Sequence, residues 1–351
     1  MGTNAEFYQH HLDRVSRSFA FCIRQLRDPL REWVGLSYLL CRIVDTIEDA
    51  PWGNGGRQAQ AFERFDQALL AVTGIQAFEC WGDLFPEEVS SGEKVLIADA
   101  ARLMRDFHAL PTPVREIIRE MVLTMSKGMQ HFCRQRGGRE LRLLSLDEVN
   151  TYCFFVAGVV GELLVKLLAH VEDRFRLSQA MLLNAYNFGL FLQKVNLLKD
   201  QVIDEKLGRH LIPSRGVVEE SAHMNAVAAL ELILEVPGEQ LEFRRFCAWS
   251  FFLGLESLMV VRSSPEVGEV VKVARSRTQE ILRVVESRLT HSEGLRELFQ
   301  SYANQLGWFS ATMGDAADLC GTPVGRPLPD WLLKTYRGSL DAAALCTLGM
   351  G

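Results

Sequence analysis

The chain has 351 residues, of which 48% are hydrophobic, enough to build a large buried core. Its formal net charge of −6 argues against nucleic acid as a partner, because a polyanion usually calls for a basic surface. Apolar residues are spread evenly through most of the sequence. We therefore expect one domain over residues 1–314, followed by a partly ordered tail at 315–351 that is richer in glycine and proline.

Almost every segment shows the period of about 3.6 residues that is typical of amphipathic helices. Alternating strand patterns joined by hairpin turns are absent from the sequence. We predict an all-α fold, with a short helix in the tail near 329–335. Longer helices are expected at 29–50, 56–73, 90–109, 112–135, 146–170, 176–205, 217–235, 239–263, 266–288 and 292–313.

Two segments are apolar enough to raise the question of a membrane span, 152–171 and 246–262. Each carries charge, at Glu162 and Lys166 in the first and at Glu256 in the second. Neither reaches about 18 uninterrupted apolar residues, so we interpret both as buried helices. With no leader-like apolar run at the start and no CxxC pair among its eight cysteines, a cytoplasmic protein without a transmembrane anchor is expected.

An acidic stretch, "CRIVDTIEDA" (41–50), ends the helix predicted at 29–50. Asp45 and Asp49 stand four residues apart and share a helix face, with Arg42 on the same stripe. Their charges repel, and a hard cation with oxygen ligands, such as Mg²⁺, would offset the repulsion. Taken alone, the pair also fits a solvated helix end.

Asp200 and Asp204 repeat this spacing near the end of the predicted helix 176–205. Two amides continue their polar stripe and two basic residues stand nearby: Gln193, Asn196, Lys199 and Arg209. Two helices that each present an aspartate pair can face each other across a cavity, hold several Mg²⁺ ions and bind a diphosphate through them. An apolar cavity would also shelter a carbocation, which suits a prenyl diphosphate as substrate.

Four blocks resemble the squalene/phytoene synthase family, in the family's order. They are "SRSFAFCIRQL" (16–26), "DTIED" (45–49), "YCFFVAGVVG" (152–161) and "GLFLQKVNLLKDQVIDEKLGRHLIP" (189–213). Within the family, "GLFLQKVN" is similar to the squalene synthases, whereas phytoene synthases more often have a Gln-Leu-Thr-Asn version. The later segment "FCAWSFFLGLESLMVV" (246–261) also resembles a squalene-synthase helix.

The resemblance implies an isoprenoid-synthase helical bundle around a large central cavity. It implies head-to-head (1′–1) condensation of two farnesyl diphosphates through presqualene diphosphate, followed by reduction to squalene for sterol or hopanoid biosynthesis. The implied cofactors are Mg²⁺, which Mn²⁺ can replace, and NADPH. Contact with a membrane surface would serve product release, and the resemblance leaves monomer and dimer equally open.

The resemblance also assigns roles to residues. The implied metal ligands are Asp45, Glu48, Asp49, Asp200 and Asp204. The implied diphosphate contacts are Ser16, Arg17, Ser18, Arg42, Gln193, Asn196, Lys199 and Arg209. Tyr152 stands where the family has a catalytic tyrosine, whose phenol could orient or accept the proton lost as the cyclopropane forms. Without this block, a core tyrosine with a satisfied hydroxyl would be the favoured interpretation of Tyr152.

The sequence departs from the family in the second acidic motif. Ile203 occupies a place that usually holds an acid, and Lys199 replaces the arginine of eukaryotic relatives. No G-x-G-x-x-G motif marks a dinucleotide site, so NADPH would have to bind in an extension of the prenyl cavity. Lys272, Arg275 and Arg277 loosely resemble a basic segment near the NADPH phosphates, although a solvated basic face fits them as well.

Two alternatives stay open at this point. One is a synthase on the same scaffold that transfers no hydride, of the dehydrosqualene, phytoene or hydroxysqualene type. The other is a non-catalytic helical relative that kept the fold and lost the chemistry. The retained aspartates, with Arg42 and Tyr152, favour an enzyme, because a scaffold has no physical need for paired carboxylates.

Overall fold

The structure is a computed structural model that describes residues 4–53, 55–78, 80–136, 140–172, 175–263, 272–308 and 330–350. Within these residues the protein is helical apart from two short strands, β1 (Leu141–Arg142) and β2 (Arg209–His210), which pair in parallel. The predicted all-α fold class is therefore confirmed.

The helices agree with the predicted ones to within a few residues over most of the chain. The long α-helices are α3 (Leu30–Asp49), α4 (Gly55–Leu70), α7 (Thr112–Arg136), α9 (Val159–Val171), α10 (Gln179–Lys206), α11 (Arg215–Glu235), α12 (Leu241–Ser263), α13 (Arg275–Glu286) and α14 (Ser292–Gln305). The shorter ones are α1 (Asn4–Val15), α2 (Arg17–Ile23), α5 (Ser91–Ala98), α6 (Ala100–His108), α8 (Leu146–Cys153), α16 (Asp330–Thr335) and α17 (Ala342–Cys346). Three further turns are the 3₁₀ segments η1 (Val72–Phe78) and η2 (Trp81–Leu84) and the π-helical segment η3 (Phe154–Gly158).

Some boundaries differ from the prediction. The single helix expected at 90–109 is broken at Asp99, which ends α5 and precedes α6. The helix expected at 266–288 begins at Arg275, and residues 266–271 lie outside the described residues. The helix expected at 292–313 ends at Gln305, and residues 309–313 lie outside the described residues. Helices α1, α2 and α17 were not predicted, because each is short and gains its order by packing on longer helices.

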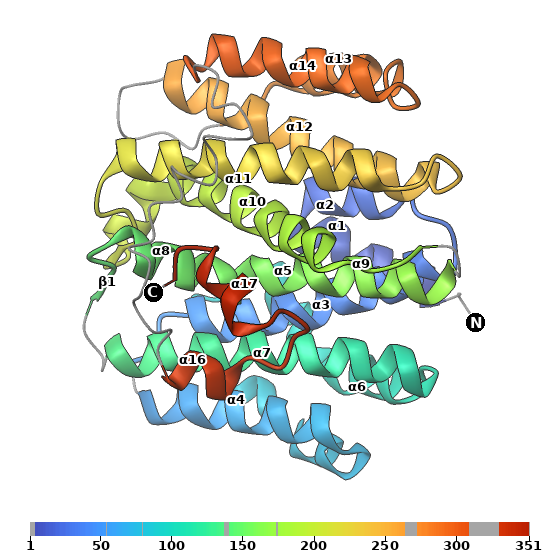
Figure 1. The fold of residues 1–351 in the computed structure, drawn as a ribbon. Helices are drawn as coiled ribbons and strands as arrows, with labels where there is room; N and C mark the ends of the chain where they lie inside the picture. The colour runs from blue at the N-terminus through green and yellow to red at the C-terminus, as the bar shows by residue number, and fades with distance from the viewer. Residues whose placement is uncertain are drawn as a thin grey trace. The chain divides into compact units, whose positions relative to one another are not determined.

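The chain divides into two compact units, of which the first comprises residues 1–139, 162–176 and 335–338. Helix α3 lies at the centre of this unit and contacts α1, α4, α5, α6 and α7 (Figure 1). Most side chains of α3 are buried, so the acidic residues at its end belong to a core helix. Helix α4 also packs against α7, and a cavity lies between these two helices.

The second unit comprises residues 140–161, 177–334 and 339–351, and α10 is its central helix. Helix α10 contacts α11, α12 and η3, and Figure 1 shows α13 and α14 lying beyond α12. Two glycines allow α10 to cross the η3–α9 segment closely. A Cβ on Gly161 would stand 1.8 Å from the carbonyl oxygen of Ala185, and one on Gly189 would stand 2.2 Å from that of Ala157. Only glycine fits where two backbones approach this closely.

The C-terminal segment 330–350 contacts residues earlier in the chain. Helix α16 confirms the short helix predicted near 329–335. The Trp331 ring stacks on Phe155 at a centroid distance of 5.3 Å, and Asn150 Nδ2 donates a hydrogen bond of 3.0 Å to the Gly349 carbonyl. Residues 315–329 lie outside the described residues, and the single domain expected over 1–314 stays a prediction.

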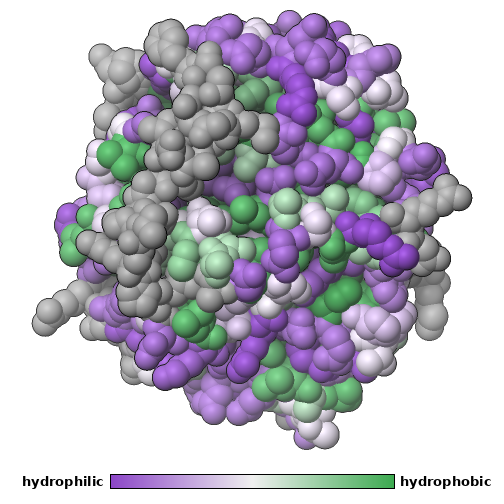
Figure 2. All heavy atoms as spheres, viewed as in Figure 1, coloured by the Kyte–Doolittle hydropathy of each residue, from purple (hydrophilic) through white to green (hydrophobic). Residues whose placement is uncertain are grey.

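Two helical stretches are long and apolar enough to cross a membrane by length and composition, Leu146–Val171 and Leu241–Ser263. In the fold, 78% and 67% of their most apolar windows are buried, respectively, as in the core helices of a globular protein. The prediction that both are buried helices is therefore confirmed. Figure 2 shows hydrophilic side chains over much of one face of the molecule, with hydrophobic ones in separate patches.

Candidate functional site

Three carboxylates converge at the C-terminal end of α3. One oxygen each from Asp45, Glu48 and Asp49 lies within 4.8 Å of the other two. Asp45 is half-buried, Glu48 is only 3% exposed and Asp49 is exposed, so the group extends from the core to the surface. No other group of three such ligands occurs among the residues described in the structure. Carboxylate oxygens are the donors that Mg²⁺ prefers, so the donor set fits that ion.

The position of these acids at the end of the helix makes their negative charges energetically unfavourable unless a cation lies close to them. The C-terminal end of a helix carries partial negative charge from its unpaired carbonyl groups. No basic residue lies in the last turn of α3 to offset this charge. The three carboxylates add further negative charge. A divalent cation bound between them would offset both the charge of the helix end and the charge of the carboxylates.

Arg42 joins the acidic group to a neighbouring helix. Its Nη1 lies 2.5 Å from Asp45 Oδ2, and its Nη2 lies 2.6 Å from Oε1 of Glu93 in α5. Burial works to lower the pKa of Arg42, but the Asp45 and Glu93 carboxylates outweigh it and raise that pKa above its ordinary value. Arg42 therefore stays charged beside the acids. Glu93 was not predicted, although Ser90, whose hydroxyl accepts from the Glu93 amide, gives it a capping-box signature in the sequence.

The N-terminal Ser-Arg-Ser block lies in the same unit as the acidic group. Ser16 precedes the first residue of α2. Burial raises the pKa of Tyr38 of α3 to about 12, although Ser16 and the nearby charge of Arg42 work to lower it. The side chains of Arg17 and Ser18 lie outside the described residues, so their predicted contacts stay predictions.

The second aspartate pair lies near the end of α10. Asp204 is 7% exposed, and its Oδ1 is 2.5 Å from Nη2 of Arg209. Asp200 is more accessible and lies 3.3 Å from Lys199 Nζ, which also donates to Asn196 Oδ1. Lys199 therefore contacts both Asn196 and Asp200, two residues of the predicted polar stripe. Gln193, one turn earlier on the predicted polar stripe, is half-buried.

The strand pair explains why Arg209 reaches Asp204. After α10, Gly208 adopts a φ of +73°, a conformation that favours glycine and turns the chain away from the helix. Arg209 then pairs with Leu141 across β1 and β2. Ile203, at the position where the family usually has an acid, is 38% exposed, and α10 supplies two carboxylates here rather than three.

Tyr152 lies at the end of α8 and is 3% exposed. The next residues form the π-helical segment η3, a distortion that occurs frequently at functional sites. Burial raises the pKa of the neighbouring Cys153 thiol to about 12, although the charge of Lys194 works to lower it. This thiol therefore stays protonated at neutral pH.

Lys194 is a buried cation that the sequence analysis did not single out. It is fully buried in α10, and its Nζ lies 2.6 Å from both Ser221 Oγ and Asn225 Oδ1 of α11. Asn225 in turn donates to Asn187 Oδ1. The signal in the sequence was a lysine inside the apolar run of a core helix, because buried charge is rare unless it is held by polar partners.

The predicted NADPH-contacting residues differ in their surroundings. Arg277 forms a bidentate pair with Glu256, through Nε at 2.9 Å and Nη2 at 3.1 Å, and Tyr302 donates to the same carboxylate. Arg277 therefore packs α13 against α12. Lys272 and Arg275 are exposed. A role for the three residues in binding NADPH stays a prediction.

The two acidic groups belong to different units, Asp45 to the first and Asp204 to the second. That the two aspartate pairs face each other across a cavity stays a prediction.

Comparison with known sequences gives a consistent family assignment. The sequence model described as squalene/phytoene synthase matches residues 12–277. The squalene synthase ERG9 of Candida albicans is 30% identical over 204 residues, which are 58% of this chain and 44% of that protein. The squalene synthase of Cyberlindnera jadinii is 25% identical over 323 residues, 84% of this chain and 69% of that protein. The chain thus matches less than half the length of the Candida relative.

Comparison with solved structures supports the fold. The complex of TcSQS with the ligand BPH1237 aligns with a TM-score of 0.64 at 21% identity and covers 98% of each chain. A dehydrosqualene synthase in complex with a ligand aligns with a TM-score of 0.58 at 18% identity, covering 82% of this chain and 96% of that one. The predicted isoprenoid-synthase fold is therefore confirmed.

Proposed function

Because the chain belongs to the squalene/phytoene synthase family, we propose that it is an NADPH-dependent squalene synthase that condenses two farnesyl diphosphates head to head. The observation that carries this proposal is the convergence of the Asp45, Glu48 and Asp49 carboxylates within 4.8 Å at the end of a core helix. The relatives from Candida albicans and Cyberlindnera jadinii, which are squalene synthases, support the choice of product.

The residues present fit Mg²⁺. Asp45, Glu48 and Asp49 would hold it at one acidic cluster, and Asp200 and Asp204 at a second. Bound Mg²⁺ supplies stabilisation of the negative charge that develops on a departing diphosphate. Arg42 and Arg209 would bind further phosphate oxygens, since a guanidinium offers several donors in a fixed plane.

The first reaction joins the two substrates. Diphosphate leaves C1 of one farnesyl diphosphate with the electrons of the C–O bond, and the C2–C3 double bond of the other attacks the resulting allylic cation. Loss of one proton closes the cyclopropane ring of presqualene diphosphate. The Tyr152 phenol would orient the reacting chain or accept this proton, assisted by the departed diphosphate. Tyr152 is only 3% exposed, and burial of this kind would keep water from the cation.

The second reaction consumes presqualene diphosphate. Its diphosphate leaves with the C–O electrons and the cyclopropylcarbinyl cation rearranges. NADPH, when bound, would supply the hydride that converts the rearranged cation to squalene. Lys272 and Arg275, which are exposed at the start of α13, are the proposed contacts for the NADPH phosphates.

A second candidate is a synthase that releases its hydrocarbon without hydride transfer. Two observations favour it: the likeness to a dehydrosqualene synthase structure, and the engagement of Arg277 by Glu256. Both candidates share the first reaction and differ only in how the last cation is quenched.

Product analysis separates these candidates. Purified protein is incubated with farnesyl diphosphate and Mg²⁺, with and without NADPH, and the hydrocarbons are identified by gas chromatography with mass spectrometry. We expect squalene only when NADPH is present. The same product with and without NADPH would support the second candidate, and no release of diphosphate in either mixture would overturn both.

The metal site is tested by Asp45→Asn. We expect turnover to fall at least about 100-fold, because the change removes a metal ligand, while the fold stays intact. Glu87→Gln is the matched control, since Glu87 is an exposed acid of the same unit that lies outside the acidic group. An unaffected rate in Asp45→Asn would refute the proposed metal site.

A further inference from the structure

Two side chains that follow α3 in the sequence fold back to hold its last carbonyl groups. Trp52 Nε1 donates a hydrogen bond of 2.7 Å to the Ile47 carbonyl. Gln58 Nε2 donates to the same carbonyl at 2.9 Å and to the Glu48 carbonyl at 3.2 Å. The last four carbonyls of a helix have no partner within the helix, and these two side chains supply partners for two of them.

The two held carbonyls lie among the acidic residues. Ile47 and Glu48 stand between Asp45 and Asp49, and one of the held carbonyls belongs to Glu48 itself. The donors therefore fix the backbone from which the three carboxylates project. They also place positive N–H ends against the negative end of α3, which lowers the electrostatic cost of collecting carboxylates there.

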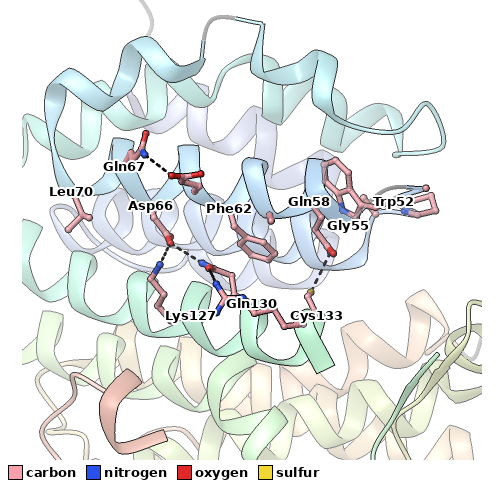
Figure 3. A pocket seen from close by; sticks show the side chains of 16 residues that line it. Trp52, Gly55, Gln58, Phe62, Asp66, Gln67, Leu70, Lys127, Gln130 and Cys133 are labelled. Atoms are coloured by element: carbon pink, nitrogen blue, oxygen red, sulfur yellow. Dashed lines mark hydrogen bonds and ion pairs between the residues drawn. The ribbon is translucent and has the colours of Figure 1, made fainter. Parts of the chain in front are cut away.

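Gln58 is itself fixed from a second helix. Trp52 and Gln58 line a cavity of about 770 Å³ between α4 and α7, and Gln58 Nε2 also lies 3.4 Å from Cys133 Sγ of α7. Figure 3 shows Gln58 extending from α4 toward Cys133. The orientation of this amide thus depends on how α4 packs against α7.

Asp66 secures that packing further along the cavity. Its carboxylate is buried and accepts from Lys127 Nζ at 2.5 Å and from Gln130 Nε2 at 2.9 Å (Figure 3). One acid of α4 is therefore held by two residues of α7. The amide of Gln58 is consequently presented to α3 by a rigid pair of helices rather than by a loop.

We propose that Gln58 and Trp52 are positioning residues for metal binding at the end of α3. They touch neither the metal nor the substrate, and they act by holding the backbone at Ile47 and Glu48 so that the carboxylates converge. The inference rests on the proposed function for the presence of a metal at Asp45, Glu48 and Asp49. It adds two residues outside the acidic group that determine how tightly that metal binds.

The substitutions are chosen to remove the donors and little else. Gln58→Met keeps the length and most of the volume of the side chain. Trp52→Phe keeps an aromatic ring against Phe85, whose ring centroid lies 5.2 Å from that of Trp52. Gln67→Met is the matched control, because Gln67 lies on α4, lines the same cavity and hydrogen-bonds through its side chain to the exposed Glu63.

The measurement uses protein without substrate. The melting temperature is followed as Mg²⁺ is added, and Mn²⁺ binding is followed by electron paramagnetic resonance at low temperature. We expect the cation concentration for half-maximal effect to rise about fivefold to tenfold in Gln58→Met and in Trp52→Phe, and further in the double variant. Gln67→Met should match wild type.

The outcomes distinguish this inference from the proposed function. If wild type responds to Mg²⁺ and both variants respond at the same concentrations, the positioning role is wrong and the metal site stands. If wild type neither gains thermal stability nor binds Mn²⁺, the metal site itself is wrong, and the inference falls with it. A variant with a lower melting temperature is still judged by its Mn²⁺ affinity, which loss of stability alone would not change in the folded protein at low temperature.

Discussion

Arg209 Nη2 lies 2.5 Å from Oδ1 of Asp204, and the two residues come from different elements, β2 and α10. Both side chains are largely buried, which strengthens their electrostatic interaction relative to a surface pair. The β1–β2 pairing supplies the geometry, because it fixes the backbone of Arg209 beside the end of α10. An anionic ligand that approaches Asp204 through a metal ion therefore meets a cation already in place.

Replacing Arg209 tests that arrangement. We expect kcat/KM for farnesyl diphosphate to fall about 100-fold in Arg209→Gln and less in Arg209→Lys, which keeps the charge and loses the planar set of donors. Steady-state kinetics and a thermal melt measure both effects. Arg215→Gln is the control, because Arg215 is an exposed arginine that pairs with Glu219 on the surface. Wild-type kinetics in Arg209→Gln would contradict the proposed phosphate contact.

Tyr152→Phe tests the catalytic tyrosine. If the phenol orients or accepts a proton, kcat should fall by about 10²- to 10⁴-fold with a smaller change in KM. Tyr186→Phe provides the comparison, since Tyr186 is also buried in the same unit and stacks on Phe154. Equal kcat values for Tyr152→Phe and wild type would make Tyr152 a core residue only.

Ionisation of Glu93 should make the thermal stability of the protein depend on pH. Burial works to raise the pKa of Glu93, but the charge of Arg42 and the hydrogen bond from Ser90 lower it below its ordinary value of 4.5. A carboxyl whose pKa is depressed by folding stabilises the protein above that ordinary value, and this stabilisation is lost as the pH falls through the folded-state pKa. The melting temperature of Glu93→Gln should therefore lie below that of wild type near neutral pH.

The difference between Glu93→Gln and wild type should shrink as the pH falls below 4.5. Thermal melts from about pH 7 downward measure this difference. Glu87→Gln, at an exposed acid, should stay close to wild type throughout. A difference for Glu93→Gln that is constant over the whole range would contradict a contribution from its ionisation.

Gly189→Ala tests the close crossing of α10 and η3. The added Cβ would stand 2.2 Å from the Ala157 carbonyl oxygen, so the helices must separate, and we expect a loss of about 3 kcal/mol in the free energy of unfolding. Gly216→Ala is the control, because no atom lies within 4 Å of its Cβ position in α11. That variant should be stabilised by up to about 1 kcal/mol. Urea unfolding measures both, and equal stabilities would refute the close crossing.

Tyr336→Phe tests the packing of the C-terminal segment. The Tyr336 hydroxyl donates a hydrogen bond of 2.9 Å to Glu162, whose side chain is fully buried and also pairs with Lys166. Loss of a hydrogen bond to a buried charged group should cost about 1.5–3 kcal/mol of unfolding free energy. Gln179→Ala, which removes an exposed hydrogen bond to the Ser339 carbonyl, should cost far less. A Tyr336→Phe protein as stable as wild type would rule out this anchor.

The acidic group at α3 could be predicted from the sequence because its geometry is local. Residues four apart in a helix lie on one face, so the spacing of Asp45 and Asp49 already implied that their carboxylates would lie close together. Glu48 was added by the family resemblance. The stripe that contains Asn196 and Asp200 followed from the same helical rule. Helix positions were predictable for a related reason, since the apolar period reports which face is buried.

Contacts between segments far apart in the sequence could not be predicted from the spacing of residues. Glu93 reaches Arg42 across 51 positions, and Gln58 reaches the Glu48 carbonyl only because α4 turns back along α3. The pair of Arg277 with Glu256 likewise joins residues of two helices. Such partners depend on tertiary packing, which one-dimensional spacing does not encode.

The glycine crossing in the second unit has a consequence for redesign. Because the backbones of α10 and the η3–α9 segment touch at Gly161 and Gly189, their separation is set by main-chain atoms and not by the side chains around them. Side chains elsewhere on these helices can then be exchanged for larger or smaller ones while the frame that carries Tyr152 and Asp200 stays in register. Stability is therefore open to adjustment at the surrounding side chains, and the crossing is the part of the molecule to leave untouched.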